Sequence, residues 1–395
     1  MKLYDRNLYA RKRHIEEKVR AIIDDVRVNG DDALIKYTRR FDKVKLTTRQ
    51  IRVPESEISG AFQNITSDFI SSLKTIINNV SGFYKLQLKK PCRMASIDGA
   101  VLTEMIQPME SVGIYIPAGT APLVSTVYMT VIPAKVAGVK RIAIVTPPDE
   151  NGRINPYILA VANLLNVNEI YKVGGAQAIA ALAFGTKTIA KVDKIIGPGN
   201  MFVTEAKRQL FGYVDIDMLA GPTELVIIAN RFSNPDYIVA DLEAQAEHIG
   251  GLTVLITTSK ALGKQIRKRF SKGFIIFAKN IEEAITISNH IAPEHLQILT
   301  NNPGSIAKHI RNAGAIFLGP FSPTAVGDYV AGPSHVLPTL GTAKFSSGLS
   351  LSTFSKRSHI ISYSKKALEK VYEPLQKVAA IEGLVKHYES VKVRF

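Results

Sequence analysis

The first 95 residues carry apolar side chains at three- and four-residue spacing, the pattern of helices that bury one face. The stretches with this spacing cover residues 14–28, 31–41 and 56–84. Between the first two stands Asn29-Gly30-Asp31, a combination that commonly ends one helix and starts another. We therefore expect a helical N-terminal segment over residues 1–95.

From residue 96 the pattern changes to short apolar runs, glycine-rich turns and alanine-rich stretches with helical spacing. The strand-like runs are residues 112–117, 141–146, 169–173, 224–229, 253–257, 273–277 and 315–318. Strands that alternate with helices are typical of parallel sheets with crossover helices. We expect an α/β protein with two successive Rossmann-like units, over residues 96–215 and 216–345. A duplication would explain two such units, although the sequence contains no clear repeat.

The last segment, residues 346–395, is expected to be helical from Lys365 onwards, with breaks near Pro374 and Gly383. A short helical tail has little apolar surface to bury by itself. We therefore expect it to pack on another surface, such as a partner subunit.

Charge alters this picture only slightly. The 395 residues include 50 Lys and Arg against 34 Asp and Glu, a formal net charge of +16. The basic residues are dispersed, with short clusters such as residues 11–13 and 267–269, and no basic tail or aromatic-interleaved RNA motif is present. The charge favours attraction to anionic ligands such as a dinucleotide and does not establish nucleic-acid binding.

The cellular compartment is indicated by the cysteine count and by the apolar runs. Cys92 is the single cysteine, so no intrachain disulfide can form and a reducing, cytoplasmic setting is expected. Residues 1–6 lack the apolar core of a signal peptide. The longest uncharged run, residues 111–134, is interrupted by prolines and glycines, so we expect no membrane helix.

A polar run, Asp241 to His248, separates two strand-like segments and contains no glycine, proline or β-branched residue. We expect it to be helical. Gln245 and His248 are three residues apart, so an amide oxygen and an imidazole could converge on one point and form half of a metal site. The alternative is a solvated helix face without a ligand.

Three further segments offer acid–base or metal-binding side chains. Glu294 and His295 are expected in a loop between a helix and a strand, where His suits proton transfer near neutral pH and Glu can activate a water. Residues 327–335 and 381–387 each contain one carboxylate and one imidazole. A zinc site needs three or four donors from different elements, and with one cysteine these would be mainly imidazole, carboxylate and amide.

The nucleotide signal is weaker. The pattern Gly-x-Gly-x-x-Gly after a strand is absent, although Gly174-Gly175 and the turn at residues 197–200 stand at plausible strand ends. Ligands of parallel sheets bind at the carboxyl ends of the strands, where Tyr115 and Gln177 are expected. A Rossmann-like cofactor site would therefore be an atypical one.

Taken together, eight segments occur in an order that resembles histidinol dehydrogenase, and the resemblance runs from about residue 15 to the C-terminus. The segments are residues 111–122, 174–185, 197–209, 220–224, 245–248, 292–296, 327–329 and 334–339. The resemblance implies a fold like that of aldehyde dehydrogenases, with a cofactor-side first unit and a second unit that carries the metal and the catalytic residues. It implies a zinc-dependent homodimer that oxidises L-histidinol to L-histidine with two NAD, the last steps of histidine biosynthesis.

Residue roles follow from the same resemblance. The zinc ligands would be Gln245, His248, Asp328 and His387. The NAD-contacting residues would be Tyr115, Gln177 and Asn200. The substrate would be held by Thr223, His335 and Glu382, together with the zinc ligands and the catalytic pair Glu294 and His295. Glu382 and His387 are expected to complete the site of the other subunit.

In the mechanism that the resemblance implies, His295 removes the hydroxyl proton in the first oxidation, and Glu294 activates the water that attacks the bound aldehyde. Two positions depart from the family pattern. Ala118 stands where glycine is usual and would be strained if that position needs φ > 0. Thr223 replaces the usual Ser and keeps the hydroxyl.

Two rival functions remain open. One is a sibling NAD-dependent dehydrogenase of the same fold that acts on another small hydroxylated substrate. The other is a basic RNA-binding module, whose affinity would fall steeply with salt.

Overall fold

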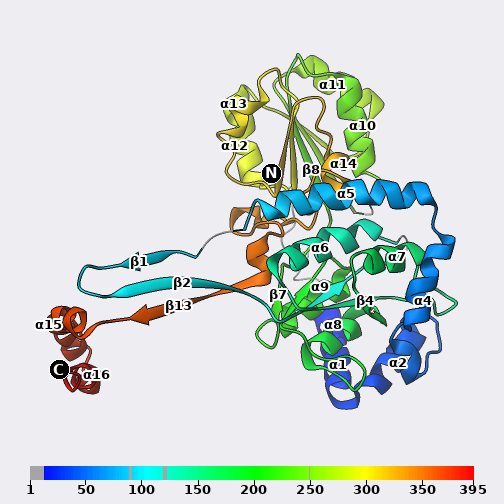
Figure 1. The fold of residues 1–395 in the computed structure, drawn as a ribbon. Helices are drawn as coiled ribbons and strands as arrows, with labels where there is room; N and C mark the ends of the chain where they lie inside the picture. Colours follow the sequence, from blue (N-terminus) through cyan, green and yellow to red (C-terminus); the bar gives the residue numbers. More distant parts are fainter. Residues whose placement is uncertain (1–12, 89–90, 119–121, 249) are drawn as a thin grey trace. The chain divides into compact units, whose positions relative to one another are not determined.

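The computed structural model describes residues 13–88, 91–118, 122–248 and 250–395 (Figure 1). The described chain forms two compact units. The first contains the residues up to Gln87 together with Met109–Phe354, and the second contains Leu88–Pro108 and Ser355–Phe395. Residues 1–6, in which no signal peptide is expected, lie outside the described residues, as do residues 119–121 after Ala118.

The N-terminal helices of the first unit are α1 (Arg13–Asn29), α2 (Asp31–Phe41), α3 (Thr48–Ile51), α4 (Glu55–Gly60) and α5 (Ser67–Lys85). The stretch with helical spacing over residues 56–84 is divided, because a 3₁₀ turn, η3 (Ala61–Asn64), separates α4 from α5. The new helix starts at Thr66, whose hydroxyl accepts a hydrogen bond from the Phe69 N–H. The apolar faces of α1 and α2 belong to the same core as α8.

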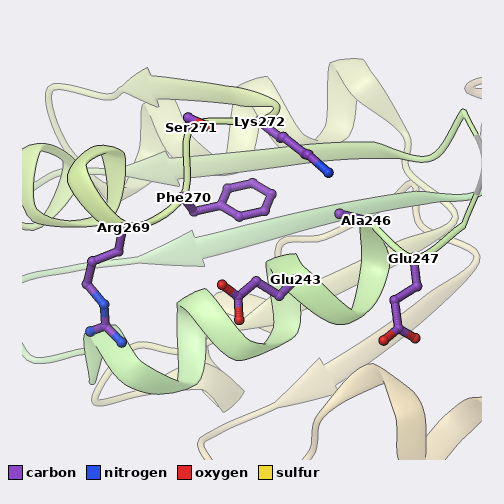
Figure 2. A pocket seen from close by; sticks show the side chains of 7 residues that line it. All are labelled: Glu243, Ala246, Glu247, Arg269, Phe270, Ser271 and Lys272. Atoms are coloured by element: carbon purple, nitrogen blue, oxygen red, sulfur yellow. The ribbon is translucent and has the colours of Figure 1, made fainter.

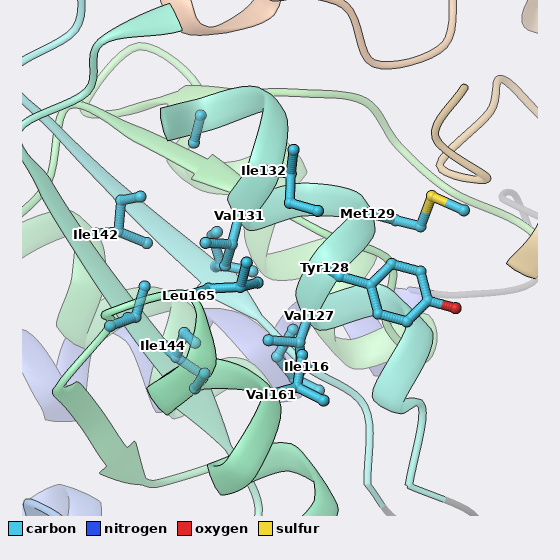
Figure 3. Close-up of a cluster of buried hydrophobic side chains, with 14 of the residues drawn as sticks. Ile116, Val127, Tyr128, Met129, Val131, Ile132, Ile142, Ile144, Val161 and Leu165 are labelled. Atoms are coloured by element: carbon cyan, nitrogen blue, oxygen red, sulfur yellow. The ribbon is translucent and has the colours of Figure 1, made fainter. Parts of the chain in front are cut away.

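The first sheet is entirely parallel, with strand order β5-β4-β3-β6-β7. Its strands are β3 (Ser111–Tyr115), β4 (Arg141–Thr146), β5 (Glu169–Lys172), β6 (Lys194–Ile196) and β7 (Asp215–Ile216). Its crossover helices are α6 (Val124–Ala137), α7 (Pro156–Leu164), α8 (Gly175–Phe184) and α9 (Met201–Leu210). Alternate residues of a strand face opposite sides of the sheet. Accordingly, Ile142 and Ile144 join the core that contains α6 and α7, shown in Figure 3, while Ala143 and Val145 join the core of α8 and α9.

The second sheet repeats this strand order as β10-β9-β8-β11-β12, again entirely parallel. Its strands are β8 (Glu224–Ala229), β9 (Leu252–Thr257), β10 (Phe274–Phe277), β11 (His295–Ile298) and β12 (Ala315–Leu318). Its helices are α10 (Pro235–Gln245), α11 (Lys260–Arg269), α12 (Ile281–Ile291) and α13 (Pro303–Ala307), followed by α14 (Thr324–Tyr329). The predicted pair of Rossmann-like α/β units is confirmed, and the identical strand order is a repeat that the sequence does not display.

The second unit is an antiparallel sheet of β1 (Arg93–Ala95), β2 (Val101–Pro108) and β13 (Ser355–Ser362), followed by α15 (Lys365–Ile381) and α16 (Val385–Lys392). β1 falls within the segment expected to be helical, and β13 falls within the expected tail. The helix break expected at Pro374 is wrong, because α15 runs through it, whereas the break at Gly383 is present with φ 72°. Apolar side chains of this unit are exposed, among them Ile381, which is 88% exposed.

The described helices include none that is long and apolar enough to cross a membrane.

A buried ion pair closes the turn after β6. The Lys207 ammonium donates to the Asp217 carboxylate and to the Gly197 carbonyl, and the other Asp217 oxygen accepts the Gly197 N–H at 2.7 Å. Both charged side chains are almost completely buried. A buried charge that loses its partner is strongly destabilising.

Asp217→Ala should therefore lower the free energy of unfolding by about 3–5 kcal/mol, measured by urea denaturation, because Lys207 is left uncompensated. The matched control is Asp236→Ala, which breaks the exposed pair with Arg269 and should cost less than about 1 kcal/mol. Equal losses in the two variants would contradict this account.

Candidate active site

The candidate catalytic pair lies at the amino edge of the second sheet. His295 is the first residue of β11 and Glu294 immediately precedes it, so the expectation that both lie in a loop is wrong for His295. Both side chains are buried. Ala292, with φ 55°, makes the turn that connects α12 to this strand. β11 pairs with β8, and therefore Thr223, just before β8, lies at the same edge.

The hydrogen bonds of His295 fix its tautomer. Its Nδ1 lies 3.1 Å from the backbone carbonyl oxygen of Glu224, which can only accept, so Nδ1 carries the proton. Nε2 is then the basic nitrogen, and it lies 3.4 Å from Oδ1 of Asp328. The Glu294 carboxylate accepts the Glu224 N–H at 3.0 Å and lies 3.5 Å from Nδ1 of His295. This geometry suits His295 as a general base, with the Glu294 carboxylate held next to it.

The electrostatics of the two catalytic candidates differ. Burial raises the pKa of Glu294 above its usual value, and the neighbouring His295 only partly opposes this. Burial alone would lower the pKa of His295, but the carboxylates of Asp328 and Glu294 outweigh burial and raise it. Both shifts are typical of groups that transfer protons.

Asp328 and His335 come from one short segment. Asp328 lies on α14. His335 Nδ1 donates to the Asp328 carbonyl oxygen at 2.9 Å, and its Nε2 lies 3.4 Å from the Thr126 hydroxyl. Burial lowers the pKa of His335, and electrostatic repulsion from His295 and His248 lowers it further. Asp328, His295 and His248 therefore all lie within electrostatic reach of His335.

The expectation that Gln245 and His248 lie on one face of a helix is wrong. α10 ends at Gln245, and residues 246–248 form a turn that leads to Gly250-Gly251. The buried Gln245 amide donates from Nε2 to the Thr223 hydroxyl at 3.1 Å, which leaves Oε1 as the available donor atom for a metal. The His248 side chain is exposed.

Zinc in proteins is bound by nitrogen, oxygen and sulfur donors that come from several elements. Among the described residues, no group of three His, Cys, Asp or Glu side chains is arranged to hold a metal ion. Within the first unit, the candidate zinc ligands are the side chains of His248 and Asp328 together with the amide of Gln245. The tail residues Glu382 and His387 belong to the second unit, and their convergence with the other site residues stays a prediction. Imidazole, carboxylate and amide donors fit zinc. The predicted set of four ligands is complete only with His387 of the tail.

The cofactor candidates lie at the carboxyl edge of the first sheet. Tyr115 ends β3, and its hydroxyl accepts the Gly175 N–H at 3.1 Å. Gln177 lies in the first turn of α8 and is 1% exposed, with no hydrogen-bond partner for Oε1 among the described residues. Asn200 caps α9 through its side-chain oxygen, which leaves its amide nitrogen available. Ala118 does not adopt a positive φ, so the strain considered at that position is absent.

Sequence reasoning missed Asp42, which follows α2. The chain after it runs along this carboxyl edge, because Val44 and Leu46 pack against Gly152 in the loop after β4. Asp42 Oδ2 is buried and has no hydrogen-bond partner in the described part of the chain, and burial raises the pKa of this carboxyl to about 6. Unpartnered acceptors such as Asp42 Oδ2 and Gln177 Oε1 fit a ligand rich in hydroxyl and amino donors, as NAD is. An aspartate after an amphipathic helix carries no sequence signal for such a role.

The two edges meet within the first unit. The Thr204 hydroxyl, in the first turn of α9, donates to the Ala220 carbonyl at 2.9 Å, three residues before Thr223. The contact of Thr126 with His335 makes a second link, because α6 follows the carboxyl end of β3. Cofactor candidates and catalytic candidates therefore border the same region.

A separate hollow of about 340 Å³ lies beside α10 and is shown in Figure 2. Its lining is Glu243, Ala246, Glu247, Arg269, Phe270, Ser271 and Lys272. None of these is a candidate site residue, and the lining mixes both signs of charge. The hollow is therefore distinct from the candidate active site.

Comparisons with known proteins agree with the resemblance. The family model for histidinol dehydrogenase matches residues 6–395. The histidinol dehydrogenase of Clostridium acetobutylicum is 48% identical over 400 residues, which cover 96% of this chain and 92% of the relative. That of Listeria innocua is 46% identical, with 96% and 93% covered.

Solved structures give the same result at the level of the fold. The crystal structure of histidinol dehydrogenase from Elizabethkingia anophelis has a TM-score of 0.92 and 39% identity, covering 96% of this chain and 92% of that one. An acetylating aldehyde dehydrogenase from Geobacillus thermoglucosidasius, at 11% identity and a TM-score of 0.51, covers 89% of this chain and 97% of its own and shares the fold alone. The chain therefore belongs to the histidinol dehydrogenase family of oxidoreductases.

Proposed function

We propose that this protein oxidises L-histidinol to L-histidine through a bound aldehyde, with two NAD and a zinc ion, as the last steps of histidine biosynthesis in the cytoplasm. Family membership supports the reaction class. The observation that carries the proposal is the group formed by the buried His295 and Glu294 and the half-buried Asp328, which supplies one proton-accepting nitrogen and a separate carboxylate at one edge.

In the first oxidation, Nε2 of His295 accepts the proton of the substrate hydroxyl. Its Nδ1–H stays bonded to the Glu224 carbonyl, so the ring keeps the tautomer that this step needs. NAD, when bound near Tyr115, Gln177 and Asn200, supplies the hydride acceptor in each oxidation. The alcohol loses one hydride and one proton and becomes an aldehyde.

In the second oxidation, the Glu294 carboxylate takes a proton from water as the water oxygen attacks the aldehyde carbon. The resulting hydrate loses a second hydride and a proton and becomes the carboxylic acid. Burial of Glu294 supports this role, because a raised pKa makes its carboxylate a stronger base than an exposed one.

Zinc would be held by Gln245, His248, Asp328 and His387 of the partner subunit, and would position the imidazole and amino groups of the substrate. The orientation of the Gln245 amide, fixed by Thr223, supports a ligand oxygen at this place. Thr223, His335 and Glu382 of the partner subunit would hold the substrate. The exposed apolar surface of the second unit supports a homodimer.

The roles of the two proposed catalytic residues can be distinguished by measuring each oxidation separately. His295→Asn should slow NADH formation from L-histidinol, and Glu294→Gln should mainly slow NADH formation from L-histidinal, each by roughly 10²- to 10⁴-fold with zinc still bound. The matched control His309→Asn, at an exposed histidine outside the site, should leave both rates unchanged. Equal losses in both oxidations for both catalytic variants would sink this division of labour.

The direction of the Glu294 shift predicts a pH dependence. Only the carboxylate form accepts a proton from water, and a raised pKa keeps the carboxyl protonated to higher pH. Oxidation of L-histidinal should therefore fail, as pH falls, at a higher pH than an exposed Glu would allow. The acidic limb should be absent from the residual activity of Glu294→Gln, and an unchanged limb in that variant would assign it to another group.

The shared site can be tested with mixed dimers. His295→Asn and His387→Asn homodimers should each be nearly inactive. If the tail completes the site of the other subunit, random subunit exchange should restore about a quarter of wild-type activity, because half the dimers are mixed and each has one intact site. Activity that stays at the level of the unmixed variants, with exchange verified by mass labelling, would place the tail in the site of its own subunit.

A further inference from the structure

We infer that Glu224 is a positioning residue for this reaction, whose carboxylate fixes Glu294 and the turn at Leu340 relative to the catalytic edge. The inference rests on the proposed function and adds a residue to which neither the sequence nor the family resemblance gave a role.

Glu224 is the first residue of β8 and is 1% exposed. Its side-chain Oε2 accepts the Glu294 N–H at 3.2 Å, while its own N–H donates to Glu294 Oε2 at 3.0 Å. Its carbonyl oxygen accepts from Nδ1 of His295 at 3.1 Å. The backbone of Glu224 therefore orients both catalytic side chains, and its side chain holds the backbone that carries them.

The register of the sheet explains why a side chain is needed here. His295 is paired with Leu225 at the start of the β8–β11 ladder. Glu294 stands one residue before that pair, and the carboxylate of Glu224 accepts its N–H where the ladder begins. A buried N–H without an acceptor is destabilising. The Glu224 carboxylate thus continues the hydrogen bonding between the two strands by one residue, as far as Glu294.

The other carboxylate oxygen, Oε1, accepts the Leu340 N–H at 2.6 Å. Leu340 has φ 56°, a conformation that costs energy for a residue with a Cβ. Its side chain packs on Gly221, where an added Cβ would lie 2.4 Å from Leu340 Cδ1, and Thr339 accepts the Gly221 N–H at 2.7 Å. Glu224 therefore also holds the strained turn that covers the residues leading to Thr223.

These contacts make length and acceptor number the important properties of the side chain. Glutamine keeps the length but replaces one acceptor oxygen by an NH₂ group that would face a backbone N–H. Either Glu294 or Leu340 must then move. Displacement of a catalytic group by about 1 Å can cost on the order of a hundredfold in rate. NAD binding and zinc content should be unaffected. The side-chain hydrogen bonds of Glu224 go to Glu294 and Leu340, and neither residue is a candidate ligand of NAD or zinc.

The test is a double-mutant cycle on the oxidation of L-histidinal, with zinc content and the Kd of NAD measured in parallel. Glu224→Gln should lower kcat by roughly ten- to a hundredfold with little change in zinc content. In the Glu294→Gln background the same substitution should change kcat by less than about threefold, because residues that act through one another are not additive. Losses that multiply fully, or a Glu224→Gln rate within about twofold of wild type, would overturn the inference.

The control is Asp241→Asn, another buried carboxylate, which accepts a hydrogen bond from Gln297 two residues beyond His295 in β11. It should leave kcat for both oxidations unchanged. If Glu224→Gln does not fold, Glu224→Asp, which keeps the charge and shortens the reach, enters the same cycle with the same expected outcome. Wild-type protein that fails to oxidise L-histidinol would reject the proposed function instead, so the two failures are distinguishable.

Discussion

The pairing of β8 with β11 is the constraint on which the candidate site depends. These strands lie far apart in the sequence and are neighbours only because the winding of the second sheet reverses between β10 and β11. The pairing brings Thr223 and Glu224 to the same amino edge as Glu294 and His295. The reciprocal hydrogen bonds between Glu224 and Glu294 then hold that edge in one arrangement.

Two properties of this edge suit the two oxidations that we propose. The Glu224 carbonyl leaves His295 with a basic Nε2, and burial raises the pKa of Glu294, so a nitrogen base and a carboxylate base lie side by side at this edge. The carboxyl edge of the first sheet adjoins this region through the contact of Thr204 with Ala220. A cofactor at the first sheet and a substrate at the second could therefore meet within a single chain, and in the proposed homodimer the tail of the partner would supply the remaining side chains.

Much of the fold could be predicted from the sequence because it depends on local periodicity. Apolar runs of strand length alternate with helical spacing, so two α/β units and the place of Tyr115 at the end of a strand followed directly. The catalytic edge could not be found this way, since the rule for parallel sheets points to carboxyl ends, and Glu294 and His295 lie at the amino end of β11. Glu224 looks like the polar start of an apolar strand until strand order is known. The pairing of β13 with β2 joins segments about 250 residues apart, which no local pattern records.

The proposed four-electron oxidation is tested by the number of NADH formed per L-histidinol consumed by the purified protein, before and after chelation and with zinc restored. Two NADH per L-histidinol are expected, with the activity lost on chelation and recovered with zinc. One NADH with release of the aldehyde, or activity that the chelator leaves unchanged, would contradict it.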